Sequence, residues 1–153
     1  MLPIRGAPLT VLGLAGVVLV GPSVQAVQAL WQADVVIRSL SVTRSGERVT
    51  ALVVVGAELG EATAVRVEVM LPVGVGLLDA GQPCRPGPSA PGVSALHARV
   101  VCPLGNLPSR GSRELRVATT VPPPGIARSF AVMALSDTPD PRPSNNYAEK
   151  VIP

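Results

Sequence analysis

The amino-acid sequence predicts an all-β protein, a single antiparallel β-sandwich, on the basis of three observations. First, 47% of the 153 residues are hydrophobic and only 15% are charged, so the chain has enough apolar material for a core and lacks the composition of a disordered tail. Second, 15 Gly and 17 Pro cluster between short apolar runs, which is typical of strands joined by turns and not of a helix bundle. Third, no sustained helical period occurs after Ala29.

The first thirty residues have the pattern of a secretory signal. Arg5 supplies a positive charge, residues 9–20 form an unbroken run of apolar and small side chains, and two triplets ending in Ala26 and Ala29 provide cleavage sites. We therefore expect a signal peptide over residues 1–29, cleaved after position 26 or 29. The alternative is an uncleaved anchor, which the run disfavours because a spanning helix needs about 20 apolar residues. No second run of that length follows, so no membrane span is expected in the mature chain.

The mature domain, residues 30–153, opens with three strands. Residues 34–42 are rich in β-branched side chains, and residues 48–56 are nearly all apolar, which predicts a covered, central strand. Residues 63–71 give the clearest pattern, because Val and Leu alternate with Arg, Glu and Met. A period of two with one mostly polar face predicts a strand that has one side in water.

The second half of the domain continues with strands and turns. Residues 82–92 hold too many prolines for a central strand, residues 112–121 alternate again, and the Pro- and Asp-rich residues 137–144 are expected to form a loop. In chain order, the expected strands are 34–42, 48–56, 63–71, 76–79, 97–103, 112–121, 127–135 and 147–152.

These seven or eight strands have the spacing of an immunoglobulin-like antiparallel β-sandwich. The expected core consists of Val, Leu and Ala, because Trp31, Phe130 and Tyr147 are the only aromatic residues of the chain.

The two cysteines, Cys84 and Cys102, both lie in the exported part of the chain, where an even number of cysteines predicts a disulfide. A zinc site would need more ligands than the nearby His97 provides, and a catalytic thiol would need a base and an orienting group. We therefore expect a structural Cys84–Cys102 bridge.

One loop carries a candidate metal site. Asp137, Asp140, Asn145 and Asn146 place four oxygen-bearing side chains within ten residues, and calcium prefers such ligands. The spacing differs from that of an EF-hand, and turn formation by Asp and Asn explains the same residues. We therefore expect neither a metal nor a cofactor. If calcium were bound, these four residues would be its candidate ligands.

Other functional classes find little support. His97 is the only histidine, no Gly-x-Ser-x-Gly motif occurs, and the acidic residues Glu58 and Glu61 are expected to be solvated loop residues. The net charge of +3 is spread over the chain without a basic patch or aromatic stacking platforms, which argues against nucleic-acid binding.

Several stretches resemble a known family: residues 33–36, residues 64–72 with their closing Leu-Pro, residues 101–107, and the Asp-rich residues 137–148 with their paired Asn. They are similar to the bacterial surface-repeat domain known as domain of unknown function eleven. The resemblance covers residues 33–152 and departs from the family at 56–62, where an Asn- and Gly-containing turn is usual. It implies an immunoglobulin-like sandwich in a secreted or cell-envelope protein, and it implies no particular activity.

The sequence thus favours a non-enzymatic, exported β-sandwich, a structural or protein-interaction module at the bacterial cell envelope, in the periplasm, on the surface or outside the cell. Partners are expected to bind through an edge strand, with residues 34–42 and 147–152 as the candidate edges. The alternative is an exported small-ligand or calcium-binding subunit that uses the 137–146 loop. An exported enzyme ranks third, because few catalytic groups are available.

Overall fold

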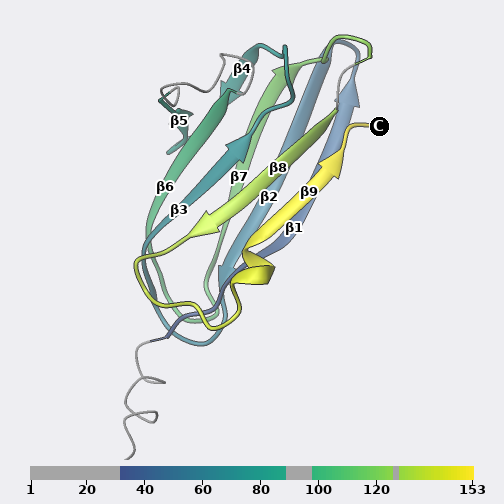
Figure 1. The fold of residues 1–153 in the computed structure, drawn as a ribbon. Helices are drawn as coiled ribbons and strands as arrows, with labels where there is room; N and C mark the ends of the chain where they lie inside the picture. The colour runs from purple at the N-terminus through teal and green to yellow at the C-terminus, as the bar shows by residue number, and fades with distance from the viewer. Residues whose placement is uncertain (1–31, 89–97, 126–127) are drawn as a thin grey trace, which may run out of the picture.

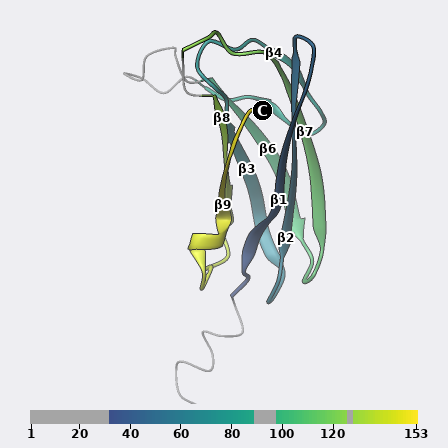
Figure 2. The same cartoon turned by 90° about the vertical axis from the view of Figure 1, so that its right-hand side faces the viewer.

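The computed structural model describes residues 32–88, 98–125 and 128–153, which form two antiparallel sheets packed face to face (Figures 1 and 2). The all-β antiparallel sandwich predicted from the sequence is confirmed. The expected signal peptide and His97 lie outside the described residues. No helix in the described part is long and apolar enough to cross a membrane.

The four-stranded sheet has the order β1-β2-β7-β4, and the five-stranded sheet has the order β5-β6-β3-β8-β9. The strands of the first sheet are β1 (Val35–Ser45), β2 (Arg48–Ala57), β7 (Ser112–Thr120) and β4 (Leu77–Ala80). Those of the second are β5 (Arg85–Pro86), β6 (Arg99–Leu107), β3 (Ala62–Met70), β8 (Ser129–Leu135) and β9 (Tyr147–Val151), and a short 3-10 helix, η1 (Pro143–Asn146), precedes β9.

The core lies between the sheets and consists mainly of valine and alanine. On β3, Val65, Val67 and Val69 are buried while Arg66 is exposed, as the alternation predicts. Phe130 is the largest fully buried side chain of the described residues. An aliphatic core of β-branched residues suits strands, because their side chains pack well on a pleated surface.

Four elements differ clearly from the sequence-based expectation. β1 continues to Ser45, because Gly46 (φ +57°) and Glu47 close a two-residue hairpin turn and the preceding residues stay in the ladder. β6 does not end at Pro103 but runs on to Leu107. The predicted Pro- and Asp-rich loop contains the short helix η1, and the proline-rich segment contributes the two-residue edge strand β5.

The first and last strands are both sheet edges, as expected from the sequence. They belong to different sheets but contact each other along one side of the sandwich (Figures 1 and 2). The chain returns to this side through η1, so the loop before β9 meets the start of β1. Both candidate sites described below lie here.

Candidate functional site

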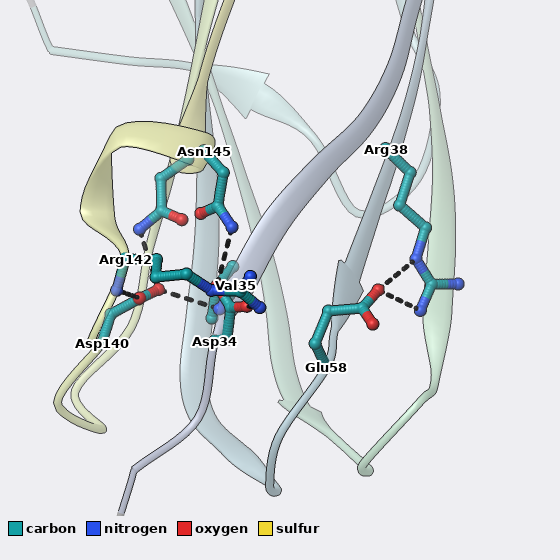
Figure 3. A network of polar contacts seen from close by, with 8 residues as sticks. Asp34, Val35, Arg38, Glu58, Asp140, Arg142 and Asn145 are labelled. Atoms are coloured by element: carbon teal, nitrogen blue, oxygen red, sulfur yellow. Dashed lines mark hydrogen bonds and ion pairs between the residues drawn. The ribbon is translucent and has the colours of Figure 1, made fainter.

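Asp140 joins the loop before η1 to the start of β1 (Figure 3). Its Oδ2 atom accepts hydrogen bonds from the Val35 backbone N–H at 2.8 Å and from the Asn146 side-chain amide at 3.0 Å. Its Oδ1 atom accepts the backbone N–H of Arg142 at 2.7 Å. Both carboxylate oxygens therefore accept hydrogen bonds from the protein. A backbone bond from Ala33 N–H to the Pro139 carbonyl (3.1 Å) lies beside them. We call this line of contacts between the start of β1 and the loop around η1 the seam.

A second carboxylate, Asp34, lies fully buried beside this seam. It accepts hydrogen bonds from the Arg142 guanidinium and from the Asn145 side-chain amide, the latter at 2.8 Å (Figure 3). A buried carboxylate is costly unless it is paired and hydrogen-bonded, and these two donors meet that need. Together with Asp140, they fix the C-terminal loop against the first strand.

The structure places the four calcium candidates in two different settings. Asp140, Asn145 and Asn146 belong to the seam, whereas Asp137 lies outside it, in a shallow hollow of about 510 Å³ that Glu61 also lines. The two asparagines turn their amide nitrogens, not their oxygens, toward the carboxylates. Within residues 32–88, 98–125 and 128–153, no group of three or more His, Cys, Asp or Glu side chains is arranged to hold a metal ion.

The side-chain oxygens of Asn145 and Asn146 are buried without a hydrogen-bond partner among the described residues. Arg142 brings a positive charge into the same cluster, which disfavours a cation there. The hydrogen bonds of Asp34, Asp140, Arg142, Asn145 and Asn146 thus hold this loop against the first strand.

Cys84 and Cys102 form a disulfide, the pairing expected from the sequence. Cys102 is fully buried on β6, and Cys84 is half-buried just before β5. The bridge therefore attaches the short edge strand and its proline-rich surroundings to the sheet.

Glu58 and Glu61, expected to be merely solvated, have specific partners. Glu58 accepts two hydrogen bonds from the Arg38 guanidinium at 3.1 and 3.2 Å (Figure 3), and Glu61 accepts the Asn106 side-chain amide at 3.1 Å. The Arg38–Glu58 pair is well exposed on both sides, so it contributes about 1 kcal/mol or less.

The outer face of the five-stranded sheet carries exposed apolar side chains next to the charged Glu68 and Glu149. Met70, Tyr147 and Val151 are three of the five exposed large hydrophobic residues in the described part of the chain, with 38%, 48% and 68% of their surfaces accessible. The half-buried Met133 lies between strands β3 and β9, directly opposite Tyr147. We call Met70, Met133, Tyr147 and Val151 the β9 patch.

The free edge of β9 lies beside this patch. Ile152 N–H donates to the Arg128 carbonyl at 2.7 Å, so the hydrogen-bonded positions on β9 are the even-numbered residues that face β8. The backbone groups of Tyr147, Glu149 and Val151 therefore point away from β8. Among the described residues, no strand pairs with β9 on that side.

A small polar network lies on the same face. The Glu149 carboxylate accepts the Ser129 hydroxyl at 2.6 Å and the Tyr147 hydroxyl at 3.1 Å. These hydrogen bonds, first that of Ser129 and then that of Tyr147, lower the pKa of Glu149. The hydrogen bond to Glu149 raises the pKa of Tyr147, so this hydroxyl keeps its proton.

Sequence reasoning found the Asp140 loop and the two edge strands but not the Asp34–Arg142 pair. These two residues are 108 positions apart, so no local sequence pattern indicates that they pair. For the two patch residues on β9 a signal was present, since Tyr147 and Val151 stand an even number of positions apart and so share one face of a strand.

Comparison of the chain with protein-family models and with curated proteins finds no match. The resemblance to the bacterial surface-repeat domain therefore stays a prediction.

Proposed function

We propose that this chain is an exported, non-enzymatic β-sandwich that binds another protein at the bacterial cell envelope through the edge of β9. The observation that carries this proposal is the open β9 edge beside the β9 patch. Free backbone donors and acceptors provide affinity for an added strand, and exposed apolar side chains next to them provide contact area.

The other edges are less suited to this role. β4 has four residues with a register shift, and β5 has two residues, of which Pro86 has no N–H to donate. At the start of β1, the N–H groups of Val35 and of Ala33, which precedes the strand, donate to the loop before η1. A further register shift interrupts β1 between Ile37 and Ser39.

Two sequence features support export. The signal pattern over residues 1–29 directs the chain across a membrane, and a disulfide such as Cys84–Cys102 persists in oxidising compartments outside the cytoplasm.

Site-specific photo-crosslinking tests the proposal. A photoreactive amino acid is placed at Val151 in the full chain, expressed in its native host, and the control is the same substitution at Leu78, a half-exposed apolar residue on the β4 edge. We expect a discrete protein adduct from position 151 and none from position 78. Equal labelling at both positions, or no adduct at 151, would contradict the proposal.

A further inference from the structure

We propose that the partner of the β9 edge is a second copy of this chain, whose β9 strand pairs antiparallel with the first about a two-fold axis at Ala148. This inference rests on the proposed function and names the partner of the same edge. It follows from which residues of β9 direct their backbone N–H and C=O groups outward, and from the charges along the strand.

The positions of the outward-pointing backbone groups limit how two copies of β9 can pair. Because the backbone groups of Tyr147, Glu149 and Val151 point outward, each of these residues must face an odd-numbered residue of the other strand. With two-fold symmetry, the axis then passes through one of the five residues of β9.

Charge excludes two of these five registers. An axis at Glu149 places the two Glu149 carboxylates directly opposite each other, and an axis at Lys150 does the same for the two ammonium groups. Like charges directly opposite each other destabilise a strand pair. Both residues are exposed on the strand.

The small number of paired residues excludes two more registers. An axis at Tyr147 or at Val151 leaves only that residue paired with its own copy within β9, so the strands share a single hydrogen-bonded position. An axis at Ala148 pairs Tyr147 of the first copy with Glu149 of the second. By symmetry, it also pairs Glu149 of the first copy with Tyr147 of the second.

The Ala148 register is also chemically complementary. Each Tyr147 hydroxyl then lies opposite the Glu149 carboxylate of the other copy, so the bond that these two groups make within one chain, at 3.1 Å, can be exchanged for the same bond between the copies. It also brings the two β9 patches next to each other, and the two five-stranded sheets become one ten-stranded sheet. Because the shared edge is short, the association is weak and reversible.

Disulfide trapping tests this register in the full mature chain. The native cysteines are paired, so Ala148→Cys introduces a single free thiol. In the proposed dimer the two Ala148 Cα atoms form a non-hydrogen-bonded pair, about 4.5 Å apart, which lies within disulfide range. The control is Lys150→Cys, whose two copies would be separated by four residues, or about 13 Å.

We expect mild oxidation to convert Ala148→Cys, but not Lys150→Cys, into a covalent dimer. Sedimentation of the wild type should show a concentration-dependent dimer, weakened about tenfold by Glu149→Lys, which removes both symmetric Tyr147–Glu149 pairs.

Equal trapping of the two cysteine variants, or a strict monomer without trapping, would overturn the pairing of two copies. If position 151 still crosslinked to a different protein, the proposed function would stand and only the identity of the partner would be wrong. If neither an adduct at position 151 nor trapping at position 148 were found, both proposals would fall.

Discussion

The Asp140 carboxylate accepts the backbone N–H of Val35 across 105 positions of the chain, at 2.8 Å. Val35 is the first residue of an edge strand, so this N–H would otherwise be free for a neighbouring chain. One side chain therefore occupies the first N–H of the β1 edge.

We expect Asp140→Ala to destabilise the fold by about 2–3 kcal/mol, because three donors, two of them backbone groups, lose their acceptor. Urea unfolding measures this loss. Asp137→Ala is the matched control, an exposed acidic residue of the same loop outside the seam, and should cost less than about 0.5 kcal/mol. Similar losses in the two variants would show that the seam does not hold the loop.

Removing the partner of the buried Asp34 should cost more than removing an exposed ion pair. Arg142→Met leaves this carboxylate with the Asn145 amide alone, and we expect a loss of about 1–3 kcal/mol, moderated because 60% of the Arg142 side chain is exposed. Arg38→Met, which breaks the exposed pair with Glu58, should cost about 1 kcal/mol or less. The two variants are compared by thermal and urea unfolding, and a reversed order would contradict the assigned role of Asp34.

The disulfide should contribute a large share of the stability. Cys84 and Cys102 are 18 positions apart, and closing a loop of this size stabilises a domain by about 3 kcal/mol. Cys84→Ser and Cys102→Ser should each lower the thermal midpoint, and the double variant should be no worse than either single one. Thiol titration of the denatured, unreduced protein should find no free thiol. Two titratable thiols, or unchanged midpoints, would refute the prediction.

The network around Glu149 gives a prediction for pH titration. The Ser129 and Tyr147 hydroxyls lower the pKa of Glu149, so its ionised form is favoured in the folded state. The resulting small stabilisation is present at neutral pH and is lost as the pH falls through the folded-state pKa. In Ser129→Ala, the pKa of Glu149 followed by NMR should rise toward its ordinary value. An unchanged titration curve would mean that Ser129 does not bond to the carboxylate in solution.

Residue pattern predicted most of the fold because the strands have one buried face. The alternation in 63–71 and 112–121 gave β3 and β7 nearly to their ends, since a one-residue slip would expose every valine. The expected strand 97–103 stops short of the end of β6 because Gly105, Asn106 and Pro108 are residues typical of turns. Pro103 is tolerated since it faces Arg66, next to a register shift where the ladder is already interrupted.

The candidate sites were predicted less well. The sequence identified Asp140, Asn145 and Asn146 as a polar cluster, but their partners come from the start of β1, which only the tertiary fold brings to this loop. Asp34 likewise was not recognised as a site residue, because its partners Arg142 and Asn145 lie far from it in the sequence. The open edge of β9 could be expected from its terminal position, whereas the phase of its free backbone groups required the pairing with β8.

Amide hydrogen exchange along β9 tests the central claim, that this edge is the binding surface and a second copy its partner. The amides of Ala148 and Lys150 bond to β8 and should exchange slowly at every protein concentration. Those of Tyr147 and Glu149 should exchange rapidly in dilute solution and slow down as the concentration rises, while the Val151 amide, outside the overlap, stays fast. Exchange of Tyr147 and Glu149 that is rapid at all concentrations, or slow at all of them, would contradict the account.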